Sequence, residues 1–63
     1  MNVGKKLAAL RGKRSMPETA EALGVSLSAY IKYERNERVP RDELNVKIAK
    51  YYGKTVHEIF FAN

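Results

Sequence analysis

Between residues 15 and 35 the sequence encodes two short helices joined by a tight turn, and the rest of so short a chain must pack around them. Ser15 begins the first helix as an N-cap, and Glu18 three residues later completes the capping-box pattern. Gly24 follows the last apolar residue, where helices commonly end in the left-handed conformation that glycine adopts readily. Ser26 is a second N-cap, so another helix is predicted to begin directly after it.

The second helix is predicted over 27–35 and must cross the first at a steep angle, because so few residues join them. Ala20 is small enough to let the two backbones approach at the crossing. The apolar residues whose spacing places them on the inner side are Leu23, Val25, Tyr30 and Tyr33. This pattern is that of a helix-turn-helix, whose second helix projects outward and can enter the major groove of DNA.

Further helices are predicted on both sides of this motif. A first helix runs from a cap at Asn2 to about Arg11, with Gly12 after its end. Its apolar stripe at helical period is Val3, Leu7 and Leu10. Thr55 and Glu58 form a second capping box, which predicts a short last helix through residues 59–61.

A fourth helix is predicted to begin at Pro40 and the acidic residues 42–43, which the helix dipole favours in a first turn. Gly53 ends this helix. Its expected buried face comprises Leu44, Ile48 and Tyr51 or Tyr52, with Val46 and Ala49 beside it. The predicted fold class is therefore all-α, a compact bundle of five short helices.

The 63 residues suffice for one domain, predicted to span residues 1–63. A chain of this length buries only about 60% of its unfolded surface, so its core must be small. The absence of cysteine excludes disulfides and thiolate metal sites and fits a reducing cytoplasm. No apolar run approaches the roughly 20 residues that span a bilayer, and the N-terminus lacks the apolar region of a secretory signal. We therefore expect a cytoplasmic protein without membrane contact.

The net charge of +5 is unevenly distributed along the chain. The first 14 residues contain no acid, and their cations are Lys5, Lys6, Arg11, Lys13 and Arg14. Such a basic face serves either as a solvated surface or as a binding surface for a polyanion, most commonly nucleic acid. The capped helix pair favours nucleic acid.

The chain resembles the phage-repressor (Cro-like) helix-turn-helix family, also called the xenobiotic-response-element family. The resemblance is carried by Ala20, Leu23–Ser26, Lys32–Arg35, Arg38 and Pro40, and then by Lys47–Gly53 and Glu58–Phe60. It covers roughly residues 3–61 and implies a lambda-repressor-like fold. It further implies a prokaryotic or phage-encoded regulator, most simply a repressor, which binds double-stranded DNA at a near-palindromic operator and usually acts as a homodimer.

By this resemblance, the base-reading positions fall on the outward face of the second motif helix: Leu27, Ser28, Ala29, Ile31 and Lys32. Lys32 suits guanine O6 and N7, and Ser28 suits several base edges. Leu27 and Ile31 form an apolar ridge that fits thymine methyl groups. Alternatively, the ridge is ordinary exposed surface or binds a protein.

The candidate contacts to the DNA backbone are Lys13, Arg14, Ser15, Met16, Ser26, Arg35, Asn36, Arg38 and Arg41. Lys13 and Arg14 flank a helix N-terminus, whose free N–H groups bind phosphate. Met16 stands where the family often has Gln and cannot make that residue's hydrogen bonds. Asn36 replaces a more usual Gly and tolerates the left-handed turn.

Two further pairs have expected structural roles. The family resemblance implies an ion pair between Arg11 and Glu34 that fixes two helices relative to one another. Of Phe60 and Phe61, one is expected to pack inside while the other contacts a second copy in a symmetric dimer, although both can instead fold back on the first helix.

Nothing in the sequence suggests catalysis, a cofactor or a metal. His57 is the only histidine, and neither a cysteine nor a convincing serine partner accompanies it. Two rival functions keep the same fold. One is a protein-interaction module, such as an antitoxin or phage regulator, and the other is a charge-driven, non-specific nucleic-acid binder.

Overall fold

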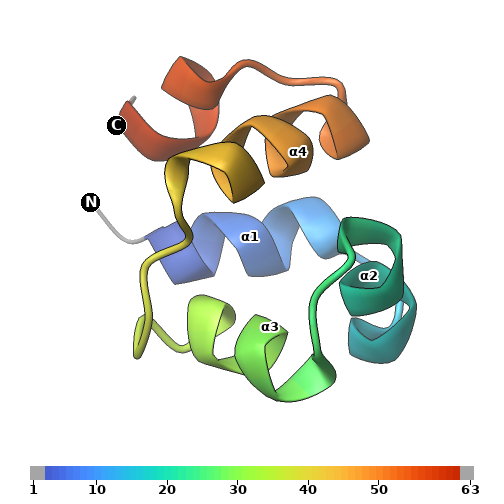
Figure 1. Ribbon diagram of the computed structural model, residues 1–63. Helices are drawn as coiled ribbons and strands as arrows, with labels where there is room; N and C mark the ends of the chain where they lie inside the picture. The colour runs from blue at the N-terminus through green and yellow to red at the C-terminus, as the bar shows by residue number, and fades with distance from the viewer. Residues whose placement is uncertain (1–2, 62–63) are drawn as a thin grey trace.

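The first helix lies across the middle of the molecule, and the other helices pack around it (Figure 1). The computed structural model describes residues 3–61. Their elements are α1 (Val3–Arg11), α2 (Met16–Leu23), α3 (Leu27–Glu34), α4 (Asp42–Tyr52) and the five-residue π-helical turn η1 (His57–Phe61). α1 contacts α3 and η1, while α2 contacts α3 and α4. The predicted all-α bundle of five short helices is confirmed, and the predicted cap at Asn2 lies outside the described residues.

The predicted helix caps of the motif are present, but the capping box predicted at Ser15 is half formed, because the Glu18 carboxylate does not accept the Ser15 N–H. The Ser15 hydroxyl accepts the N–H of Glu18 at 3.2 Å, and the Ser26 hydroxyl accepts the N–H of Ala29 at 3.1 Å. Gly24 has a φ of 72°, and its N–H and that of the next residue bond back to the last turn of α2. These bonds satisfy backbone groups that a helix end otherwise leaves free, so the turn between α2 and α3 is fixed locally.

The core lies between the inner faces of all five elements. Leu7, Tyr30 and Ile48 are completely buried at its centre. Around them lie Ala20, Leu23, Tyr33, Ala49, Ile59 and Phe60. The predicted inner face of the motif is therefore confirmed.

Two details of the fourth helix differ from the sequence prediction. α4 begins at Asp42 with Arg41 as an N-cap that makes no side-chain cap bond, whereas Pro40 is buried in the preceding loop. Val46 is 46% exposed and does not belong to the buried face. It lies two residues from the buried Ile48, and at 100° per residue this separation places the two side chains on opposite sides of the helix.

Gly4 brings the start of α1 against the end of α3, a contact that the sequence analysis did not predict. The Gly4 N–H donates to the Asn36 side-chain oxygen at 2.9 Å. A Cβ at Gly4 would lie 2.7 Å from the carbonyl carbon of Glu34, so no larger residue fits without displacement. Asn36 has a φ of 60°, and this left-handed turn carries its side chain to α1.

The second capping box is complete. The Thr55 N–H donates to the Glu58 carboxylate at 3.0 Å, and the Glu58 N–H donates to the Thr55 hydroxyl at 3.0 Å. In the turn that follows, Phe60 is buried and Phe61 is 68% exposed. Within the part of the chain that the structure describes, no helix is long and apolar enough to cross a bilayer.

This capping box predicts a specific dependence of stability on pH. The bonds from the Thr55 backbone and side chain lower the pKa of Glu58 below its ordinary 4.5. The carboxylate therefore stabilises the fold fully above pH 4.5, and this contribution is lost as the pH falls through the lowered pKa. We expect the wild-type melting temperature to exceed that of Glu58→Gln near neutral pH, and the difference to shrink below pH 4.5. Thermal melts followed by circular dichroism check this, and a difference independent of pH would contradict it.

Candidate nucleic-acid interface

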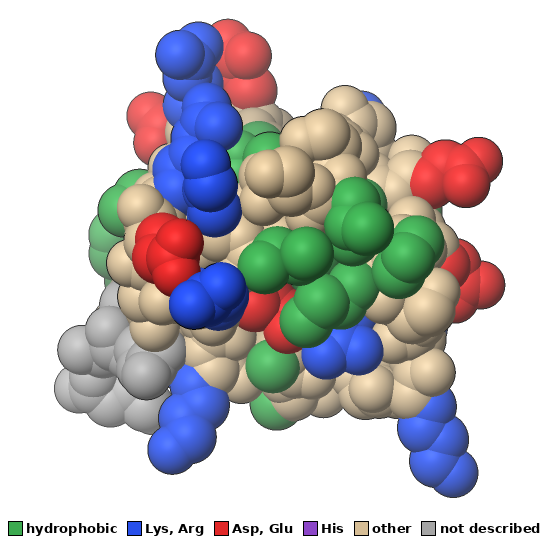
Figure 2. All heavy atoms as spheres, turned by 90° about the horizontal axis from the view of Figure 1, so that it is seen from below, with side chains coloured by type: hydrophobic (Ala, Val, Ile, Leu, Met, Phe, Trp, Pro, Cys, Tyr) green, Lys and Arg blue, Asp and Glu red, His purple; other side chains and the backbone are tan. Residues whose placement is uncertain are grey.

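The outward face of α3 carries most of the residues predicted to read bases. Leu27, Ser28 and Lys32 are exposed, and Ile31 is partly exposed. Ala29 is half-buried and packs against the core, so it presents less surface than the prediction required. Figure 2 views the molecule from the α3 side and shows hydrophobic side chains gathered in the middle of this face, with charged side chains projecting around them.

A shallow hollow of about 350 Å³ lies on this face. Its lining residues are Leu27, Ser28, Ile31, Lys32, Arg35 and Glu37. Arg35 Nε lies 2.9 Å from the Glu37 carboxylate, and both side chains are well exposed. Glu37 is the acid that interrupts the basic run of the loop after α3, and its ion-pair partner is Arg35 rather than Arg38 or Arg41. Because Arg35 compensates its charge, Glu37 does not leave an unpaired carboxylate at a surface otherwise suited to an anion.

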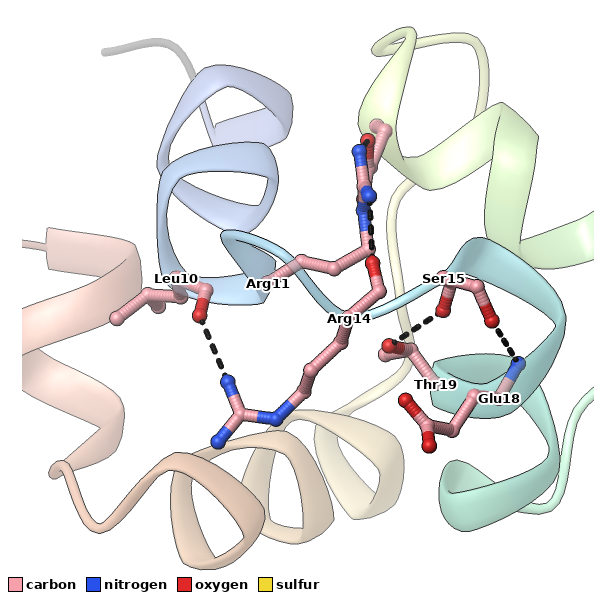
Figure 3. A network of polar contacts seen from close by, with 7 residues as sticks. Leu10, Arg11, Arg14, Ser15, Glu18 and Thr19 are labelled. Atoms are coloured by element: carbon pink, nitrogen blue, oxygen red, sulfur yellow. Dashed lines mark hydrogen bonds and ion pairs between the residues drawn. The ribbon is translucent and has the colours of Figure 1, made fainter.

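The residues predicted to bind phosphate near the start of α2 are not all placed there. Arg14 turns away from α2: its guanidinium donates to the Leu10 carbonyl at 3.2 Å (Figure 3). It also lies over the rings of Tyr51 and Tyr52, at 5.5 and 5.6 Å from their centroids. These two kinds of contact hold the Arg14 guanidinium near the end of α4. It does not point toward the N-terminus of α2, where the sequence predicted it.

Other side chains at the same end of α2 divide between solvent and core. Lys13 is exposed beside the helix N-terminus, as predicted. Met16 is half-buried and packs against the core. The Ser15 hydroxyl is occupied as the cap, and the Ser15 carbonyl accepts the Thr19 hydroxyl at 3.0 Å (Figure 3). Pro17 has no N–H and the Glu18 N–H is bonded to the Ser15 hydroxyl, so a phosphate at this position would contact the Met16 backbone N–H and Lys13.

The loop between α3 and α4 also divides its polar residues between two roles. The Asn36 side-chain oxygen accepts the Gly4 N–H, so Asn36 also fixes α1 to α3. Arg38 is exposed and lies 5.9 Å from the centroid of the Tyr33 ring. Arg41 is exposed at the start of α4. Arg38 and Arg41 therefore remain cationic groups at the surface.

Behind this face, the predicted pair of Arg11 and Glu34 is present. Arg11 donates twice to the carboxylate, with Nε 2.6 Å and Nη2 3.2 Å from its two oxygens. Arg11 also donates from Nη1 to the Arg14 carbonyl at 2.8 Å. The Glu34 side chain is only 5% exposed. The guanidinium thus joins the end of α1, the loop before α2 and the last turn of α3, which fixes α3 relative to the bundle.

The titratable groups around this pair hold fixed charge states at neutral pH. The hydrogen bond to Glu34 raises the pKa of Arg11 above its ordinary value. Burial raises the pKa of Tyr30 and of Tyr52, and the Glu34 carboxylate raises that of Tyr30 further. Among residues 3–61, no group of three or more His, Asp or Glu side chains is arranged to hold a metal ion.

The sequence matches the helix-turn-helix family over residues 7–59, which includes the whole motif, α4 and parts of α1 and η1. No curated protein matches the chain. The family consists of DNA-binding regulatory domains of the Cro-like, lambda-repressor-like type. With its capped motif and exposed α3, the chain belongs to this helix-turn-helix family of double-stranded-DNA-binding regulators.

Proposed function

We propose that this protein represses transcription by occupying an operator whose sequence α3 reads in the major groove. The observation that carries the proposal is the outward face of α3, where Leu27, Ser28 and Lys32 are exposed on a rigidly capped helix. Exposed polar and cationic side chains at the start of such a helix reach base edges when the helix enters the groove. In the cytoplasm of a prokaryote or a phage-infected cell, occupancy of a promoter then blocks transcription.

Backbone contacts would position α3 without carrying sequence information. The groups suited to this role are Lys13, the Met16 N–H at the start of α2, and Arg35, Arg38 and Arg41 around the loop after α3. Each Lys or Arg contact to a phosphate releases counterions, so affinity should fall steeply as salt rises.

A homodimer is part of the proposal because Phe61 is 68% exposed at the C-terminal end of the described chain. An exposed aromatic ring suits an isologous contact, in which the same patch of both copies meets across a two-fold axis. Phe60 is buried and is therefore not available for this contact. A dimer with its two α3 helices about 34 Å apart would match successive turns of the major groove.

Selection of bound sequences from a pool of random duplexes tests the proposal. We expect a preferred site with two related half-sites whose centres are about 10 base pairs apart. Enrichment of no sequence over the starting pool would contradict sequence-specific reading, and a single asymmetric site would contradict the symmetric dimer.

Replacing Lys32 by alanine separates base reading from general charge attraction. If Lys32 contacts a base, the variant should lose about 1–3 kcal/mol of discrimination at one base pair of each half-site. Lys50→Ala is the matched control, because it removes the same charge from an exposed position in the last turn of α4. Competition titrations with single-base variants of the selected site measure the effect. Equal weakening of all sequences by Lys32→Ala would show that Lys32 acts only through charge.

A further inference from the structure

Two of the side chains that line the hollow on α3 are apolar, which phosphate binding does not require. Leu27 is 41% exposed, and Ile31 lies one helical turn later on the same face. Both side chains line the hollow, and their spacing of four residues makes them neighbours. A leucine and an isoleucine side by side at the centre of a surface that faces DNA predict an apolar ligand at that point.

We propose that this hollow binds the C5-methyl group of a pyrimidine in the major groove. The methyl of thymine is the one apolar group that the four ordinary bases present there. The methyl of 5-methylcytosine stands on the same ring carbon and offers the same apolar surface. The proposal rests on the proposed function, because α3 must enter the groove for Leu27 to reach a base.

The polar side chains that line the hollow fit the groups that surround such a methyl. Thymine O4, beside the methyl, accepts hydrogen bonds, whereas the amino group at C4 of 5-methylcytosine donates them. The Ser28 hydroxyl can do either, because a hydroxyl is both donor and acceptor. Glu37 compensates the charge of Arg35, so Lys32 supplies the net positive charge of the lining, which complements the negative potential of DNA. Together with the DNA-binding family to which the chain belongs, these features favour a methylated pyrimidine in duplex DNA over an apolar side chain of another protein.

Replacing thymine by uracil in the selected duplex tests the methyl contact, because only the methyl is removed while base pairing is preserved. At one position of each half-site, we expect about a four-fold loss of affinity, the value for returning one buried methyl to water. With a C·G pair at that position, 5-methylcytosine should restore most of the affinity that unmethylated cytosine lacks. Fluorescence anisotropy at one fixed salt concentration measures all these duplexes.

Two protein variants assign the effect to the hollow. Leu27→Ala should discriminate less between the thymine and uracil duplexes than the wild type does, because only Ile31 then remains as an apolar side chain of the hollow. Val46→Ala is the matched control: Val46 is 46% exposed, close to the 41% of Leu27, but it lies on α4 and does not line the hollow. This control should retain the full discrimination, and circular dichroism should show both variants folded.

The outcomes separate this inference from the proposed function. Failure of the selection to give any preferred duplex would contradict the proposed function itself. A preferred duplex whose uracil substitutions all leave affinity unchanged would overturn the methyl contact and leave operator binding standing. Undiminished discrimination in Leu27→Ala would show that the methyl is read elsewhere. If the hollow instead binds a protein, Leu27→Ala should change neither the affinity for DNA nor the discrimination between thymine and uracil duplexes. That result would also overturn the inference.

Discussion

Gly4→Ala is expected to lower the free energy of unfolding by about 2–3 kcal/mol, the upper part of the range for overpacking a close contact. The added methyl would lie 2.7 Å from the carbonyl carbon of Glu34 and 3.0 Å from the Asn36 side-chain nitrogen. The Glu34 carbonyl is helix backbone and cannot turn aside as a flexible side chain can. The start of α1 must therefore move away from α3, and the bond from the Gly4 N–H to Asn36 is lost with it.

Urea unfolding measures this loss, and Gly53→Ala is the matched control. Gly53 has a φ of 66°, and nothing lies within 4 Å of a Cβ built there. Gly53→Ala should lower the free energy of unfolding only by the cost of placing an alanine in the left-handed conformation, about 1–2 kcal/mol. The discriminating readout is the bond to Asn36: Asn36→Ala should destabilise the wild type by more than it destabilises Gly4→Ala, in which that bond is already broken. Equal effects of Asn36→Ala in both backgrounds would contradict the proposed collision.

Local chemistry explains why so much of the fold was predictable from the sequence. Ser15, Ser26 and Thr55 cap helices through hydrogen bonds to residues three positions away, so each signal lies within one turn of its effect. Gly24 and Asn36 adopt the left-handed conformations that their residue types favour. Helical periodicity likewise places Leu7 and Tyr30 inside.

The features that sequence reasoning missed depend on contacts between distant parts of the chain. Gly4 is required by the backbone of α3, about thirty residues away, and no pattern near Gly4 reports that approach. Arg14 was expected to face phosphate, but the rings of Tyr51 and Tyr52 lie beside it only once α4 has packed. The direction of a long cationic side chain follows from what surrounds it in the folded protein, which position along a helix does not specify.

Breaking the ion pair behind α3 is expected to have the other large effect. Arg11→Met should lower the free energy of unfolding by about 3 kcal/mol, because the Glu34 carboxylate, 5% exposed, is left without its partner. The loss of the bond to the Arg14 carbonyl adds to this cost, since the loop before α2 is no longer tied to α1. Urea unfolding at neutral pH measures the change.

Arg35→Met is the matched control, because it breaks an ion pair by the same substitution at the surface. The Arg35 and Glu37 side chains are 67% and 47% exposed, so the released carboxylate is solvated and stability should change by less than about 1 kcal/mol. Equal losses in Arg11→Met and Arg35→Met would contradict the role assigned to burial.

The double variant Arg11→Met/Glu34→Leu decides whether the ion pair stabilises the fold or only positions its helices. Removing both charges removes the unpaired carboxylate, so we expect most of the stability lost in Arg11→Met to return. The affinity for the selected duplex should nevertheless stay below that of the wild type. The two hydrogen bonds from Arg11 to Glu34 no longer fix the last turn of α3 against α1. Full recovery of both stability and affinity would mean that apolar packing alone holds α3 in position, and the pair would then have no role in presenting it to DNA.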